Sequence, residues 1–74
     1  MSAIVIPEYV MRMAEELNQL EDRIDKLELF MARDFELLSY EKQILMKIQL
    51  NSMKSYALVL KRRLDICAKE CNDE

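Results

Sequence analysis

Apolar residues in the first half of the chain follow one another at alternating steps of four and three positions. The members of this stripe are Ile6, Val10, Met13, Leu17, Leu20, Ile24, Leu27 and Met31. Side chains at this spacing lie on one narrow strip of an α-helix, which needs a partner helix to leave water. The pattern predicts a helix over about residues 7–33. Pro7 suits the first helical position, and Glu8 complements the positive end of the helix dipole.

The second half of the chain carries a matching stripe with further apolar residues beside it. The stripe consists of Met46, Leu50, Met53, Ala57, Leu60, Leu64, Cys67 and Cys71. The residues beside it are Ile44, Leu45, Ile48, Tyr56, Val59 and Ile66. This pattern predicts a helix over about residues 40–69, with an apolar face wider than one partner helix covers. The surplus indicates contact with a second protomer.

Residues 34–39 interrupt the pattern and predict a turn between the two helices. Ser39 is the expected N-cap of the second helix, because its side-chain oxygen can accept a hydrogen bond from a free backbone N–H. Phe35, Leu37 and Leu38 are expected to tuck under this turn.

The two ends of the chain are expected to lie outside the helices. Residues 1–6 predict an extended arm, since a proline disfavours helix at the residue before it. Residues 70–74 form an acidic tail. The predicted fold is therefore all-α: a single domain over residues 1–74, made of an antiparallel two-helix hairpin with a short N-terminal arm.

The composition excludes several classes of function. A chain of 74 residues buries little apolar surface, so oligomerisation is expected to supplement its stability. Without Gly there is no phosphate-binding loop, and without His there is neither a Ser-His or Cys-His nucleophile nor a typical zinc site. Cys67 and Cys71 stand four apart, too far for a disulfide on one helix. We therefore expect no enzyme, no cofactor and no metal.

Charge is divided between the halves of the chain. Residues 8–36 hold nine acidic and four basic residues, whereas residues 40–69 hold two acidic and seven basic residues. This division favours antiparallel pairing of an acidic helix with a basic one. The net charge of -3 argues against general binding to DNA or RNA, and no apolar run approaches the roughly 20 residues of a membrane span. We expect a cytoplasmic protein.

Candidate binding residues lie off the first stripe. Tyr9 stands at the opening of the first helix, where its ring either packs as a staple or stacks on a ligand. Arg12, Arg23 and Lys26 follow on one side of that helix, and such cations can hold phosphates. The alternative is a solvated face with pairs four apart, Glu8 with Arg12 and Asp22 with Lys26.

The second helix adds candidates with equally open roles. Arg63 ends the only basic run, Lys61 to Arg63, which either contacts an anion or stabilises the helix dipole. Tyr56 is expected in the core or an interface, with its hydroxyl at a polar edge.

The chain resembles a family of small phage proteins, the anti-CBASS type-two cyclic-oligonucleotide sponges, which are related in their helical hairpin to Thoeris anti-defence proteins. The resemblance covers about residues 8–64. The residues that carry it are Tyr9, Val10, Arg12, Met13, Glu16, Leu20, Arg23, Ile24, Lys26, Leu27, Phe30, Gln49, Leu50, Met53, Tyr56, Leu60 and Arg63.

The resemblance implies a homo-oligomer, typically a hexamer, that sequesters cyclic nucleotides without cleaving them and so blocks CBASS signalling. It implies that cyclic dinucleotides such as cyclic GMP-AMP bind between protomers and cyclic trinucleotides bind in a separate pocket. Tyr9 matches the stacking residue. Lys26 is the best match to the phosphate cation, with Arg23 and Arg12 as further candidates, and Arg63 is a candidate for the second pocket. The rival hypothesis is a coiled-coil adaptor or inhibitor that binds a host protein through an exposed apolar helix face.

Overall fold

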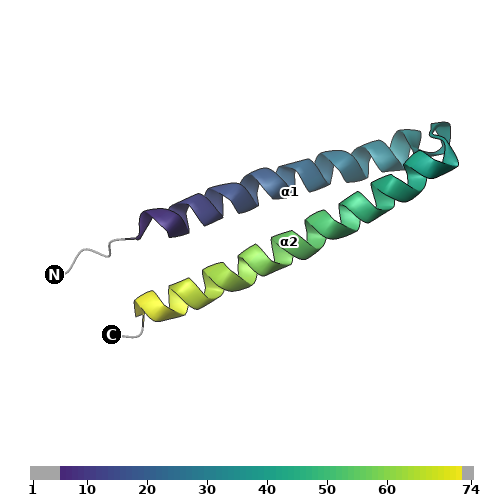
Figure 1. Cartoon of the computed structure of the whole chain (residues 1–74). Coiled ribbons are helices and arrows are strands. Elements are labelled where there is room, and N and C mark those ends of the chain that lie inside the picture. The colour runs from purple at the N-terminus through teal and green to yellow at the C-terminus, as the bar shows by residue number, and fades with distance from the viewer. Residues whose placement is uncertain (1–5, 73–74) are drawn as a thin grey trace.

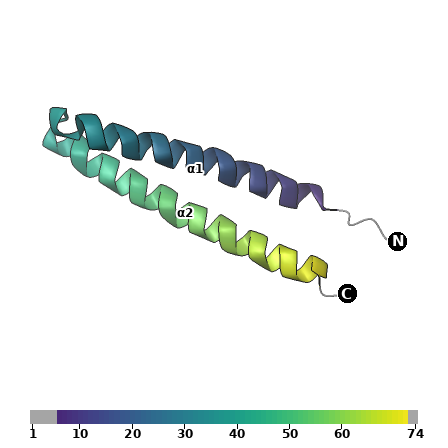
Figure 2. The same cartoon turned by 180° about the vertical axis from the view of Figure 1, so that it is seen from behind.

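The chain folds into two long antiparallel helices joined by a tight turn. The computed structural model describes residues 6–72, which form α1 (Glu8–Asp34), a short 3-10 helix η1 (Phe35–Leu37) and α2 (Tyr40–Asn72). The helices lie side by side, with the start of α1 and the end of α2 at one end of the hairpin and η1 at the other (Figures 1 and 2). Residues 6–72 contain no strand, and the predicted all-α hairpin is confirmed.

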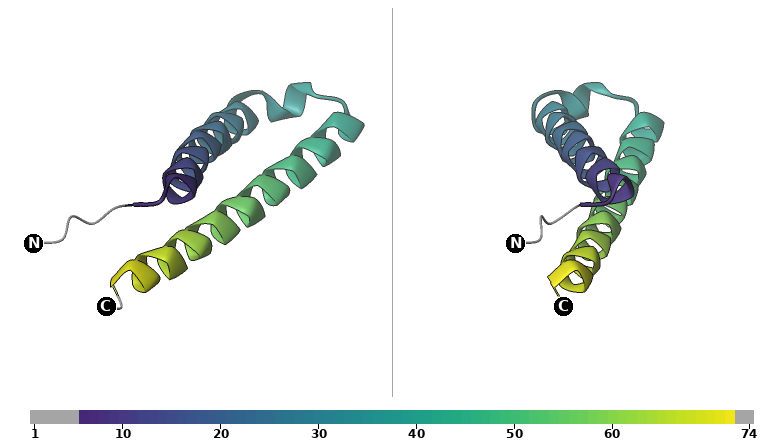
Figure 3. Two further views of the ribbon diagram at one scale, coloured as in Figure 1. Left: turned by 60° about the vertical axis from the view of Figure 1, so that its left-hand side comes forward. Right: turned by 90° about the vertical axis from the view of Figure 1, so that its left-hand side faces the viewer.

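The hairpin is a rod of 59 × 16 × 15 Å. The helix axes are inclined to each other (Figure 3), as expected where side chains at three- and four-residue spacing interlock. We call the end that carries the start of α1 and the end of α2 the open end, and the end that carries η1 the turn end.

The helix ends differ in detail from those expected. Pro7 has a ψ of 147°, so it precedes α1 as its N-cap residue instead of forming its first helical position. The Pro7 carbonyl accepts hydrogen bonds from the backbone N–H groups of Val10 and Met11, at 3.1 and 3.3 Å. α2 continues to Asn72, beyond the expected end near residue 69. The predictions made for residues 1–5, 73 and 74 lie outside the described residues.

Hydrogen bonds tie the turn to the start of α2. The Ser39 side-chain oxygen accepts a hydrogen bond from the backbone N–H of Lys42 at 3.4 Å, and the Ser39 carbonyl accepts one from Gln43 at 3.0 Å. The predicted N-cap is confirmed. The Gln43 side-chain amide donates to the carbonyls of Phe35 and Leu38, at 3.0 and 3.1 Å. These bonds join the carbonyls of the turn to the first turn of α2, and the Phe35 carbonyl also accepts a hydrogen bond from the backbone N–H of Leu38 at 3.1 Å.

The prediction that three apolar residues tuck under the turn is wrong for one of them. Phe35 and Leu38 are half-buried, whereas Leu37 is 83% exposed. Phe35 and Leu38 stand three apart and share a side of the 3-10 turn, and Leu37 points to the other side. The ammonium of Lys47 lies 5.4 Å from the centre of the Phe35 ring and covers it.

The core occupies the middle of the hairpin, where the two predicted stripes meet. Among the described residues, the buried side chains are Met13, Leu17, Leu20, Ile24, Ala57 and Leu60. The half-buried residues packed against them are Leu50, Met53, Leu64 and Cys67. Ile6, the first residue of the predicted stripe, is exposed because α1 begins after it. The other stripe residues whose side chains the structure describes are buried or half-buried, which confirms the stripes as the contact between the helices, and the side chain of Cys71 lies outside the description.

Charged residues flank the core with the predicted polarity. Lys54 of α2 pairs with Glu28 of α1 at 3.0 Å, and Lys61 pairs with Glu21 at 3.4 Å. All four side chains are about half exposed, so each pair contributes only about 0 to 1 kcal/mol. The pairs therefore favour the antiparallel register more than they stabilise the fold.

Candidate functional site

One side of the hairpin combines aromatic and basic residues from both helices. Tyr9, Glu16 and Arg23 recur every seven residues and so lie in one row along α1. The Tyr56 hydroxyl of α2 donates a hydrogen bond to the Glu16 carboxylate at 2.6 Å, which places this row beside α2. Arg63 is near enough for its charge to lower the pKa of Tyr56. We call these five residues the tyrosine flank.

Tyr9 and Arg63 both lie toward the open end of the hairpin from the Tyr56–Glu16 hydrogen bond. Tyr9 lies seven residues before Glu16 on α1, and Arg63 lies seven residues after Tyr56 on α2. Both positions are therefore displaced about 10 Å from the Tyr56–Glu16 hydrogen bond, toward the open end. The tyrosine flank thus has an aromatic ring from one helix and a guanidinium from the other at its outer end, with the hydrogen-bonded pair behind them.

Lys26 lies in a different part of α1 from Tyr9. Seventeen residues separate the two, about 25 Å along the helix axis. This separation is longer than a cyclic dinucleotide. Arg23 is about 20 Å from Tyr9 by the same measure. The structure therefore does not bring either cation to Tyr9 within one chain.

Arg12 and Lys26 form ion pairs within α1. Arg12 lies 2.8 Å from Glu8, and Lys26 lies 2.9 Å from Asp22. This is the geometry predicted for a solvated face, and all four side chains are well exposed. Such pairs contribute a few tenths of a kcal/mol, so exchanging the carboxylate for a phosphate costs little.

Arg23 and Arg63 are the less engaged cations. Both are exposed, and neither forms an ion pair within residues 6–72. Arg12 lies three residues after Tyr9, at the same end of the hairpin as Arg63. The open end therefore offers Arg12 and Arg63 around Tyr9.

Tyr56 lies at an edge and not in the core. Tyr56 is 42% exposed. Its hydroxyl reaches the Glu16 carboxylate, so it lies at a polar edge as expected. The hydrogen bond to Glu16, with burial and the carboxylate charge, raises the pKa of Tyr56 above its usual 10.0, while the charge of Arg63 opposes this rise. The sequence points to Glu16 only through the family resemblance, because pairing the two stripes in antiparallel order places Glu16 level with Lys61 and not with Tyr56.

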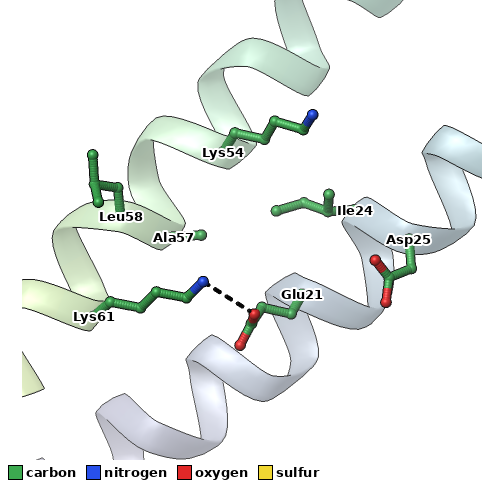
Figure 4. A pocket seen from close by; sticks show the side chains of 7 residues that line it. All are labelled: Glu21, Ile24, Asp25, Lys54, Ala57, Leu58 and Lys61. Atoms are coloured by element: carbon green, nitrogen blue, oxygen red, sulfur yellow. Dashed lines mark ion pairs between the residues drawn. The ribbon is translucent and has the colours of Figure 1, made fainter.

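The opposite side of the hairpin carries a groove of about 300 Å³. The side chains that line it are Glu21, Ile24, Asp25, Lys54, Ala57, Leu58 and Lys61 (Figure 4). Ala57 is small and leaves the space, while the Glu21–Lys61 ion pair spans one end. Two carboxylates face two ammonium groups here, so the charges balance. This charged groove is a poorer place for an anion than the tyrosine flank.

The remaining candidate chemistry is sparse in the described part of the chain. Residues 6–72 contain no group of three or more His, Cys, Asp or Glu placed to hold a metal ion. Cys67 is a free, half-buried thiol, and the side chain of Cys71 lies outside the description. Neither α1 nor α2, as far as the structure describes them, is long and apolar enough to cross a membrane.

Comparison with known proteins assigns the chain to a family. The model of a family described as Sequestin matches residues 7–66, a range that includes α1, η1 and most of α2. No curated protein and no solved structure gives a significant match. The family's name suggests sequestration of a ligand, which is compatible with binding without chemical change. Because the match covers most of the hairpin and both sides of the tyrosine flank, the chain belongs to the Sequestin family.

Proposed function

We propose that this chain is a phage immune-evasion protein that binds and sequesters cyclic oligonucleotide second messengers without cleaving them. In this role it acts in the cytoplasm of the infected cell and blocks CBASS-type antiviral signalling. It acts as a homo-oligomer, expected to be a hexamer, and takes cyclic dinucleotides such as cyclic GMP-AMP and, in a separate pocket, cyclic trinucleotides. Membership of the Sequestin family supports the sequestering part of this proposal.

The observation that carries the proposal is the grouping of Tyr9, Arg12 and Arg63 at the open end of the hairpin. A cyclic dinucleotide has purine rings that stack on an aromatic side chain and phosphates that pair with guanidinium groups. The tyrosine flank offers both kinds of contact in the half of the rod toward the open end. Two copies related by a two-fold axis would offer two such sets to a ligand with matching symmetry.

The role of the flank in sequestration is to bind, and no step of bond cleavage is assigned to any side chain. The sequence contains no His, and the Glu16 carboxylate is engaged by the Tyr56 hydroxyl. The Glu16–Tyr56 pair instead holds α1 and α2 together directly behind the candidate contacts. A preorganised flank of this kind lowers the entropy lost when the ligand binds.

Calorimetric titration of the purified protein with cyclic GMP-AMP, cyclic di-AMP and cyclic tri-adenylate tests the proposal. We expect micromolar or tighter binding of at least one of them, and recovery of the intact ligand after the protein is denatured. Absence of binding to all three would refute the proposed function. Recovery of a cleaved product would refute sequestration in favour of catalysis.

Tyr9→Ala sharpens the test, with Tyr40→Ala as its matched control. Stacking of a base on an aromatic side chain contributes about 1 to 3 kcal/mol, so Tyr9→Ala is expected to weaken dinucleotide binding about tenfold or more. Tyr40 is more exposed than Tyr9 and lies at the turn end, so its loss should leave the affinity unchanged. Equal affinities of both variants would remove Tyr9 from the site.

The cations are ranked by the same titration, using single changes to alanine. Arg63→Ala and Arg12→Ala are expected to weaken binding at the open end. Arg23→Ala and Lys26→Ala weaken it only if a second copy brings those residues to the ligand. Arg33→Ala is the control, because Arg33 lies in the last turn of α1 at the turn end.

A second candidate function rests on the apolar residues that the hairpin leaves exposed. These residues include Leu45, Ile48, Val59 and Ile66 of α2. An adaptor that binds a host protein through this surface would be a dimer with an open apolar groove and would bind none of the three nucleotides. The titration above therefore separates the two functions.

A further inference from the structure

A second apolar row runs along α2, turned around the helix from the buried stripe. The row consists of Leu45, Ser52, Val59 and Ile66, which recur every seven residues, and of Ile48, which lies three residues after Leu45. The four apolar members are between 50% and 59% exposed. Spacing of this kind is that of a coiled-coil contact with another helix. We call these five residues the outer row.

The elongated hairpin exposes more surface than a compact monomer of its mass. A compact monomer of this mass exposes about 4,800 Å². The chain exposes 6355 Å², an excess of about 1,600 Å². A stable interface takes about 800 Å² from each partner. The excess is therefore enough for one or two interfaces per chain.

We propose that the outer row is a self-association interface, in which α2 of one copy packs antiparallel against α2 of a second copy about a two-fold axis. The row spans more than five helical turns, with apolar members on both sides of Ser52, and a second copy of the same length and spacing matches it from end to end. A two-fold contact requires a self-complementary surface. The midpoint of the outer row lies between Ser55 and Tyr56, so Leu45 of one copy lies opposite Ile66 of the other, and Ser52 lies opposite Val59.

The charges on α2 select the antiparallel arrangement. In a parallel pair, Arg62 and Arg63 of one copy would face the same residues of the other. In the antiparallel pair they face Gln49 and Ile48, which are uncharged. The helix dipoles also favour opposite directions. This interface needs no ligand; it rests on the homo-oligomer of the proposed function, whose nucleotide binding is tested separately by the titration.

The interface also bears on the tyrosine flank. Tyr56 lies at the centre of the antiparallel contact, and Arg63 lies beside the outer row. The second copy would therefore border the α2 side of the tyrosine flank. In this register the two copies of Arg63 are fifteen positions apart, about 22 Å along the helices, so the contact borders two separate tyrosine flanks.

Val59→Glu tests the interface, and Leu58→Glu is its matched control. Leu58 and Val59 are neighbours with nearly equal exposure, but Leu58 faces the charged groove on the opposite side. Sedimentation equilibrium without nucleotide should show the wild-type chain as a multiple of 8.8 kDa. We expect Val59→Glu to raise the dissociation constant of the assembly at least tenfold and Leu58→Glu to leave it within threefold. A fully helical wild-type monomer, or equal effects of both variants, would overturn the proposal.

Cysteine cross-linking of the otherwise native hairpin gives a second readout if Val59→Glu does not fold. In a background with Cys67→Ala and Cys71→Ala, Leu45→Cys and Ile66→Cys proteins are mixed and oxidised. The antiparallel contact predicts disulfides between the two different variants. Disulfides only between identical variants would show a parallel contact, and no disulfide at all would exclude the outer row. Both results would overturn the proposed arrangement.

Discussion

Leu60→Ala should remove a large share of the stability of the hairpin. The Leu60 side chain is 0% exposed, so truncation leaves a cavity that neighbouring side chains fill only in part. Such a change costs about 2 to 5 kcal/mol. A chain of this length has a total stability of about 4 to 11 kcal/mol, taken from the usual value per residue. The variant should therefore lose about half of its free energy of unfolding.

Leu58→Ala removes the same three carbon atoms two residues earlier on α2. Leu58 is 51% exposed, so burial in the native fold removes only about half of its side chain from water. Its truncation therefore loses about half of the free energy of burying a leucine and leaves no enclosed cavity. We expect a loss of about 1 kcal/mol or less. The difference between the two variants therefore isolates burial from helix propensity, which both substitutions change equally.

Urea unfolding followed by circular dichroism at 222 nm measures both losses. All samples need the same protein concentration, because self-association would make the apparent stability depend on it. A loss of 2 kcal/mol or more corresponds to a fall in Tm of about 10 °C or more in a domain of this size. Equal losses for Leu60→Ala and Leu58→Ala would refute the placement of the core between the two stripes.

Two further predictions concern hydrogen bonds. The pKa of Tyr56 is raised, so the protonated phenol stabilises the fold below the unfolded pKa near 10, and this contribution disappears as the pH rises through the higher folded pKa. Above pH 10 the Tm of the wild type should therefore fall more steeply than that of Tyr56→Phe, and parallel curves would contradict the bond to Glu16. Ser39→Ala should cost about 1 kcal/mol in urea unfolding through loss of the N-cap, whereas Ser55→Ala, at an exposed mid-helix position, should cost nothing. Equal effects of the two serine changes would exclude the cap.

The hairpin could be predicted from the sequence because apolar residues recur at regular steps in both halves of the chain. The two apolar stripes have equal length and alternating steps of three and four residues. Packing against each other removes both of them from water. The polarity of the ion pairs followed for the same reason, since an acidic helix beside a basic one gives Glu21 and Glu28 partners on α2. The exposure of Leu45 and Val59 also followed, because an apolar face wider than one helix leaves residues uncovered.

Features that depend on a few backbone angles could not be predicted in this way. The exposure of Leu37 follows from a 3-10 turn of three residues, which carries no periodic signal. Pro7 lies outside α1 because its ψ angle is extended. Proline suits both the first helical position and the position before it, so the residue type did not distinguish them. The Tyr56–Glu16 bond depends on the register between the helices, which neither stripe specifies alone.

The length of the rod limits how the candidate residues can share a ligand. Tyr9 and Lys26 are about 25 Å apart along α1, and no rotation of their side chains closes that distance. Within one chain, Arg12 and Arg63 are the candidate cations that lie with Tyr9 toward the open end of the hairpin. If Lys26 contacts the same cyclic dinucleotide as Tyr9, the two residues must belong to different copies. A loss of affinity in Lys26→Ala would therefore report on the assembly, whereas a loss in Arg63→Ala would report on the flank of a single chain.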